Sequence, residues 1–205
     1  ASDAAATAAF NAQVAAAMAS TDLQNPVEPI SNINVLIDGR RQNLGMLDQR
    51  GVDLAVSYEL PTSFGDWRFG VDVAKIYKLE RQTTATAATI DVLDTFGNPV
   101  DLRTRVSLGW RKDGLSANVF ANYVDSYRNT AVTPNVEVDS QTTVDATASY
   151  AFQGDGWAKD VRVTLSVLNA FDEDPPIVIN GTSSWDSQVA SAVGRMVSLE
   201  ITKSW

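Results

Sequence analysis

The chain of 205 residues contains no cysteine and no histidine. Without cysteine it can form neither a disulfide nor a thiolate metal site. Without histidine it lacks the usual general base, the Ser-His and Cys-His catalytic pairs and the commonest zinc ligand. Its serines lie in no Gly-x-Ser-x-Gly elbow, and the sequence contains no glycine-rich phosphate loop. We therefore predict no enzymatic activity, no metal site and no cofactor.

Basic residues are also scarce, because 25 Asp and Glu outnumber 16 Lys and Arg and give a net charge of −9. This balance argues against a nucleic-acid partner, which would need clustered Lys and Arg. Long apolar runs are absent too, so no segment is a candidate transmembrane helix. The Ala-rich run at residues 4–19 lacks the basic start and the continuous apolar centre of a signal peptide. We predict a short helix there.

From about residue 43 onward, apolar residues alternate with polar ones. In the segment 100–111, Val, Leu, Thr, Val, Leu and Trp alternate with Asp, Arg, Arg, Ser, Gly and Arg. A period of two predicts a β-strand with one apolar face. Seven segments show this pattern: 51–60, 67–76, 100–111, 115–123, 144–152, 161–167 and 197–205.

Strand length separates two interpretations of this alternation. A tilted strand needs roughly 9–11 residues to cross the hydrocarbon layer, whereas globular strands are most often about 5–6 residues long. Aromatic residues near segment ends, such as Trp67 and Trp110, match the girdles of membrane barrels. One segment departs from the pattern, because Lys75 falls on its apolar face and Ile76 on its polar face. Either a bulge or emergence from lipid would explain this departure. The sequence predicts an all-β, antiparallel transmembrane β-barrel segment.

The connections between these segments alternate between short and long. Membrane barrels have short periplasmic turns and long extracellular loops. This order predicts that residues 1–42 form an extracellular loop with the Ala-rich helix, and that residues 43–205 form barrel strands. Seven strands do not close a bacterial barrel, whose strand number is even, so we expect further strands from this or another chain.

Three segments resemble the TonB-dependent receptors, active transporters of the bacterial outer membrane. Residues 43–54 resemble the start of one of the family's strands, where Asn-Leu-Gly leads to Arg-Gly-Val-Asp-Leu. Residues 168–176 (LNAFDEDPP) resemble its penultimate-strand motif, and residues 194–205 resemble its closing strand with a terminal aromatic residue. The resemblance assigns a structural role to six residues: Asn169, Phe171, Asp172, Pro175, Pro176 and Trp205.

This resemblance implies about seven C-terminal strands of a 22-stranded barrel that encloses a plug domain. It also implies uptake of a scarce nutrient, such as a siderophore, cobalamin or an oligosaccharide. Neither the plug nor the periplasmic TonB box is among these residues. The resemblance therefore implies three partners. They are outer-membrane lipid, the rest of the barrel with its plug (from the same or another chain), and the TonB energy-coupling complex. The TonB complex would act through the N-terminal part that carries the plug and the TonB box.

Two groups of residues are candidates for contact with a plug or a ligand. Charged residues on the polar strand faces are expected to line the lumen, where they would contact the plug, channel water or one another: Asp53, Glu59, Arg103, Arg105, Arg111, Asp145, Arg162 and Glu200. Trp185, with Asn180 nearby in the longest loop, suits ligand capture, although such an aromatic residue also packs loops down. The adjacent acids of segment 172–174 lack the spacing of a calcium loop.

Two further interpretations stay open from the sequence. The chain could be a separate structural subunit that completes a split outer-membrane barrel. It could also be a soluble all-β binding module, because a soluble sheet has one wet face as well.

Overall fold

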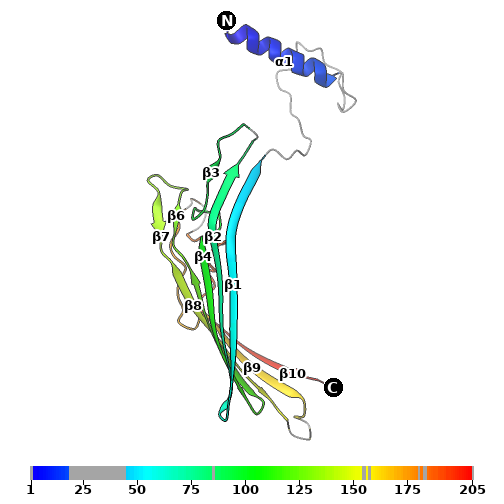
Figure 1. Cartoon of the computed structure of the whole chain (residues 1–205), viewed down its shortest axis with the longest axis vertical. Coiled ribbons are helices and arrows are strands. Elements are labelled where there is room, and N and C mark those ends of the chain that lie inside the picture. The colour runs from blue at the N-terminus through cyan, green and yellow to red at the C-terminus, as the bar shows by residue number, and fades with distance from the viewer. Residues whose placement is uncertain are drawn as a thin grey trace. The chain divides into compact units, whose positions relative to one another are not determined.

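The computed structural model describes residues 2–18, 45–84, 86–153, 156, 158–179, 181 and 184–204. The chain divides into two compact units, Ala1–Asn43 and Leu44–Trp205. The first contains helix α1 (Ser2–Met18; Figure 1), in which nine of 17 residues are alanine, the strongest helix former. No helix in the described part of the chain is long and apolar enough to cross a membrane.

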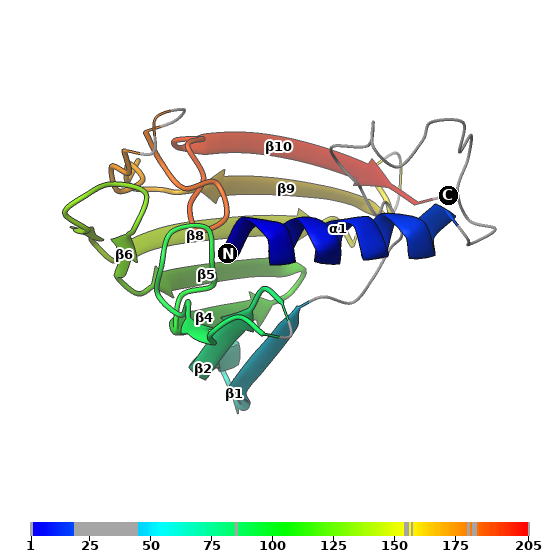
Figure 2. The same ribbon diagram turned by 90° about the horizontal axis from the view of Figure 1, so that it is seen from above.

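The second unit is an antiparallel β-structure. Seven strands form one sheet in the order β1-β2-β4-β5-β8-β9-β10, and Figure 2 shows them side by side along a curved surface. The short strand β3 pairs with β2, and β6 pairs with β7 in a separate small sheet. The strands are β1 (Met46–Thr62), β2 (Gly65–Gln82), β3 (Ile90–Asp91), β4 (Leu102–Lys112), β5 (Leu115–Val124), β6 (Tyr127–Asn129), β7 (Val136–Val138), β8 (Gln141–Ala151), β9 (Val161–Leu168) and β10 (Met196–Lys203).

The seven sheet strands confirm the predicted fold class, and each overlaps one of the seven alternating segments. The sequence missed β3, β6 and β7, which lie in the long connections and are only two or three residues long. A period of two cannot be recognised over so few residues. In the described residues β10 ends at Lys203, before the predicted end at Trp205, which lies outside them.

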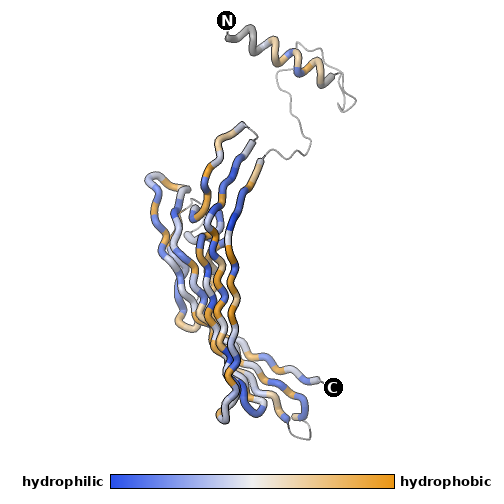
Figure 3. Tube along the Cα trace, in the orientation of Figure 1, coloured by the Kyte–Doolittle hydropathy of each residue, from blue (hydrophilic) through white to orange (hydrophobic). Residues whose placement is uncertain are grey.

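The strand register places the predicted apolar residues on one face of the sheet. Val56 lies opposite Val71, and Val71 lies opposite Val106. The row continues through Ala121 to Val144. Apolar and polar residues alternate along every long strand in Figure 3. Side chains on this apolar face stay exposed, with Val56 54% and Ile201 67% accessible. The face therefore requires an apolar surrounding.

A β-bulge explains the irregular segment in β2. Arg50 pairs with Lys78 and Gly51 pairs with Ile76, so Tyr77 is the extra residue. Lys75 lies on the apolar face and forms an ion pair with Asp101, just before β4 begins. The bulge therefore accounts for the departure, and it follows directly after the apolar band ends.

Beyond the bulge, the β1–β2 hairpin continues as a charged extension. Lys78 Nζ lies 2.9 Å from Asp48 Oδ2 and 3.0 Å from Glu80 Oε2. Hydrogen bonds from Lys78 and Arg50 hold the pKa of Asp48 below its ordinary range. Such charges are stable in water but not in hydrocarbon, so the extension lies outside the apolar band.

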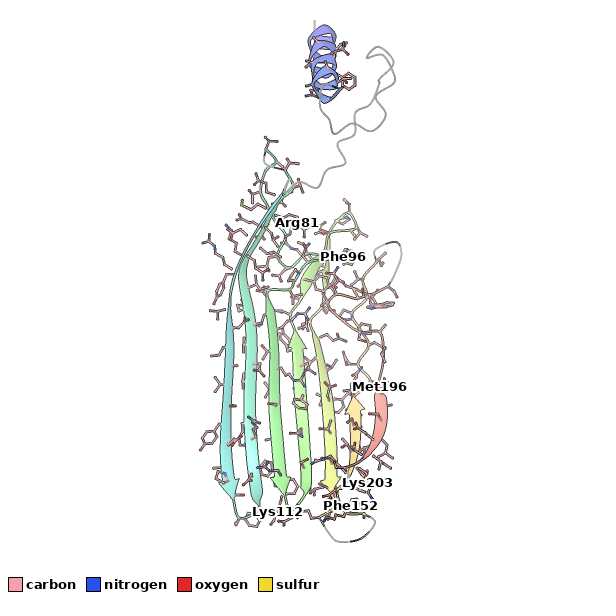
Figure 4. The ribbon with its side chains drawn as sticks, turned by 90° about the vertical axis from the view of Figure 1, so that its right-hand side faces the viewer. Arg81, Phe96, Lys112, Phe152, Met196 and Lys203 are labelled. Atoms are coloured by element: carbon pink, nitrogen blue, oxygen red, sulfur yellow. The ribbon has the colours of Figure 1, made fainter. Side chains whose placement is uncertain are left out.

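Short turns lie at one end of the sheet and long connections at the other. Lys112 and Phe152 mark the short-turn end in Figure 4, whereas Arg81 and Phe96 mark the opposite end. The turn between β4 and β5 contains Asp113 and Gly114 at positive φ, as a tight hairpin requires. The predicted alternation of short and long connections is thus confirmed.

Aromatic residues gather at the short-turn end. The rings of Trp67 and Trp110 lie 6.4 Å apart, and those of Tyr150 and Phe152 lie 4.8 Å apart edge to face. Trp110 donates its indole N–H to the carbonyl of Phe64 at 3.0 Å. Rings with an apolar body and a polar edge suit the boundary between lipid and water.

The long connections pack against one another at their own end. Val100, Tyr127, Val138 and Val178 form a buried cluster, named here the loop core. Buried Asp186 accepts hydrogen bonds from Gly97 N at 3.3 Å and from Gln188 N at 3.0 Å, and it lines a small cavity together with Tyr127. Burial is the main cause that raises the pKa of Tyr127. The three connections therefore form one joined structure.

Candidate functional site

The polar face of the sheet carries two ion pairs between neighbouring strands. Glu59 lies opposite Arg68 at 3.5 Å, and Asp66 lies opposite Arg111 at 3.3 Å. All four side chains are exposed, so each pair contributes only about 0–1 kcal/mol. Of the expected lumen residues, Glu59 and Arg111 therefore pair across strands.

Three further residues expected to line the lumen lie on the same face: Asp53, Arg103 and Arg105. The Arg105 guanidinium lies 4.2 Å from the centre of the Phe120 ring, a cation–π arrangement. Arg103 donates to the carbonyl of Gln188 at 3.3 Å, which ties the last long connection to this face. Asp53 is exposed opposite Ala74. The sequence missed Phe120, because an apolar ring on the polar face breaks the alternation.

Small residues shape a hollow in the middle of the polar face. Gly70 and Gly109 line a depression of about 400 Å³ together with Ser107, Asn118 and Phe120. A Cβ on Gly109 would come within 2.8 Å of Asn118 Oδ1. Side chains at these positions would fill the hollow, so the sequence leaves room there.

The predicted Asn-x-Phe-Asp motif forms a clamp between β9 and β10. Asn169, at φ 49°, donates from Nδ2 to the Glu173 carbonyl and accepts from Glu173 N, both at 2.9 Å. Asp172 accepts from the backbone N–H of Arg195 at 2.6 Å, next to Gly194. A Cβ on Gly194 would approach Asp172 Oδ1 to 2.7 Å. The clamp therefore sets where the chain turns into β10.

The other residues of the sequence prediction have less defined surroundings. Phe171 is 76% exposed. Pro175 and Pro176 are half-buried in the connection that follows. Trp185 is half-buried beside Asp186. Asn180, like Trp205, lies outside the described residues.

A second cavity lies where the last long connection turns over the polar face. It encloses about 450 Å³ between the outer ends of β5, β8, β9 and β10 and residues 189–194. Its polar lining consists of the strand residues Asn122, Gln141, Thr143 and Asp145, together with Asn169 and Ser191. We name it the outer pocket. Of its lining residues, the sequence marked Asp145 and Asn169, because the others come together through strand pairing that no local pattern reveals.

A curved sheet with an exposed apolar face, a charged opposite face and an aromatic end is the wall of a membrane β-barrel. The chain belongs to the TonB-dependent receptor-like β-barrel family, whose family model matches residues 9–170. This is a family of outer-membrane receptors and transporters. The match begins within α1 and ends at the start of the clamp. Searches of curated proteins and of solved structures found no match.

Proposed function

We propose that this chain forms part of the wall of an outer-membrane receptor that takes up a scarce nutrient through its lumen, with energy supplied through TonB. The observation that carries the proposal is the unbroken apolar row across β1, β2, β4, β5 and β8, exposed on one face of an antiparallel sheet. Lipid covers such a face at no cost, whereas water does not. The family match supports the transport role.

The sheet has two free edges, because within the described residues β1 and β10 each pair with one sheet strand only. An unpaired backbone group in hydrocarbon costs several kcal/mol. In the proposed receptor, further strands therefore pair with both edges and close the barrel. These strands and the plug belong either to the same polypeptide or to a partner chain.

The polar face then lines the lumen. We assign Asp53, Glu59, Arg103, Arg105 and Arg111 to the wall that contacts a plug or channel water. Residues 1–42 form an extracellular loop, and the three long connections face the outside. Trp185 and Asn180 belong to the last of these connections, where a ligand would first contact the receptor. Siderophores, cobalamin and oligosaccharides are the substrate classes in question.

A cysteine scan tests the proposed orientation, because the chain has no cysteine of its own. Single substitutions on the polar face, Asp53→Cys and Ser57→Cys, should react with a water-soluble maleimide in isolated outer membranes. Leu54→Cys and Val56→Cys on the apolar face should stay unlabelled until detergent is added. Labelling of both faces in intact membranes would contradict the barrel wall.

Transport itself is tested in cells that carry the full receptor. Growth on the limiting nutrient should depend on the receptor and should be lost in cells that lack TonB. If the strands that flank β1 and β10 belong to a partner, that second polypeptide should co-purify in detergent. Growth on the limiting nutrient that depends on neither the receptor nor TonB would refute the proposed function.

A further inference from the structure

Several amide donors in the lining of the outer pocket already form hydrogen bonds within the chain. Asn122 Nδ2 donates to Asp145 Oδ2 at 2.9 Å and to Thr143 Oγ1 at 3.3 Å. Gln141 Nε2 donates to the Asp174 carbonyl at 3.3 Å. The pocket therefore offers the Asp145 carboxylate and the two amide oxygens as acceptors, beside the Thr143 hydroxyl and the second N–H of Gln141, which are donors.

Asp145 sits at the centre of this acceptor group. Its other oxygen, Oδ1, accepts the backbone N–H of Asn169 at 3.0 Å, which holds the carboxylate in place. Asp145 is the only charged residue among those that line the outer pocket in the described part of the chain. Nearby Arg103 turns toward the Gln188 carbonyl, and Arg195 pairs with Asp172 at 3.8 Å. The pocket therefore holds a fixed negative charge without a basic partner.

The rest of the lining is largely aliphatic. Among the described residues it contains no aromatic ring, and its apolar side chains are short or branched, with one methionine: Val124, Leu168, Val189, Ala190, Val193 and Met196. The volume of about 450 Å³ lies within the range of roughly 300–1,000 Å³ usual for small-molecule sites. A ligand that carries an aliphatic segment beside a hydrogen-bond donor would fit both the aliphatic and the polar lining.

The charge of the surrounding loops points to the same chemistry. The three long connections, at residues 83–101, 125–140 and 169–195, contain ten acidic and two basic residues. They therefore carry eight of the nine net negative charges of the chain. A mouth lined by one sign of charge concentrates solutes of the opposite sign and repels anions.

We propose that the outer pocket binds the ammonium group of a small aliphatic amine, with Asp145 as its counter-ion and the branched side chains around its carbon chain. This inference rests on the proposed receptor function, because it places the ligand at the outer mouth of the lumen. It narrows the substrate to a cationic, amine-bearing molecule.

Titration calorimetry on the receptor purified from outer membranes in detergent tests the proposal with n-butylammonium as the probe. Saturable binding is expected, with affinity at least about tenfold above that of 1-butanol or butyrate, since the charge-assisted hydrogen bond is lost in both. Asp145→Asn should weaken butylammonium binding about tenfold or more. Asp113→Asn, which removes the same charge in the β4–β5 turn at the short-turn end, should leave it unchanged.

A second variant keeps the test valid if Asp145→Asn fails to fold. Ala190→Phe adds a ring inside the pocket and leaves Asp145 intact, so it should abolish binding of butylammonium. No saturable binding to the wild-type receptor, equal affinity for butanol, or full binding to Asp145→Asn would each overturn the proposal. If a lysine of the receptor already occupied the pocket, the wild type would not bind butylammonium. That result would also overturn the proposal.

The two proposals fail separately. Intact TonB-dependent growth without butylammonium binding would reject only the amine site. Butylammonium binding without TonB-dependent growth would reject only the transport function.

Discussion

At the scale of single residues, Asn169 shows why the clamp needs one residue type. Its backbone lies at φ 49°, a left-handed conformation that Asn tolerates better than most residues do. Its side chain also offers both the donor and the acceptor that the backbone of Glu173 requires. Aspartate lacks the donor and glycine lacks both. Conformation and hydrogen bonding therefore select the same residue.

We predict that Asn169→Ala lowers the free energy of unfolding by about 2 kcal/mol, through two lost hydrogen bonds and a strained φ. Urea titration of the receptor folded in lipid vesicles measures this change. Glu173→Ala is the matched control, because the clamp uses only the backbone of Glu173 and this variant should change stability by less than about 0.5 kcal/mol. Equal effects of the two substitutions would show that the clamp contributes nothing.

At the scale of elements, β4 shows the two environments of the barrel wall at adjacent positions. Val106 belongs to the apolar row and lies opposite Val71 and Ala121. Ser107, the next residue, lies on the polar face and lines the hollow of about 400 Å³. One residue step therefore separates the proposed lipid side from the proposed lumen side, since side chains alternate along a strand.

We predict that Val106→Arg destabilises the folded receptor by about 2–4 kcal/mol, as arginine does near the middle of a bilayer. Ser107→Arg should cost no more than about 1 kcal/mol, since the hollow has room for the side chain and water reaches it. Unfolding in urea from lipid vesicles compares the two. If both variants were equally stable, the apolar face would not contact lipid.

At the scale of the whole molecule, the loop core joins connections that lie far apart in the sequence. Tyr127 belongs to the second long connection, but it packs with Val178 of the third and lies beside Asp186 of the same connection. Asp186 in turn accepts from Gly97 in the first. A substitution in any one connection should therefore change the local stability of the other two.

We predict that Tyr127→Phe speeds cleavage by an external protease within residues 169–195, although the substitution lies outside that segment. Loss of the hydroxyl removes a polar group beside buried Asp186, at a cost of about 1 kcal/mol to the local structure. Limited proteolysis followed by mass spectrometry measures this. Tyr150→Phe at the short-turn end serves as the control, and cleavage at equal rates would show that the connections move independently.

The sequence by itself determined the alternation of β4 and its neighbours, the aromatic end and the motif around Asn169. Each of these features depends on residues that lie close together along the chain. The tertiary structure alone decided the bulge at Tyr77, the pairing of Arg105 with Phe120, and the outer pocket around Asp145. These features depend on which residue of one strand lies opposite which residue of the next. Strand register is a property of long-range pairing, and a local pattern of period two does not contain it.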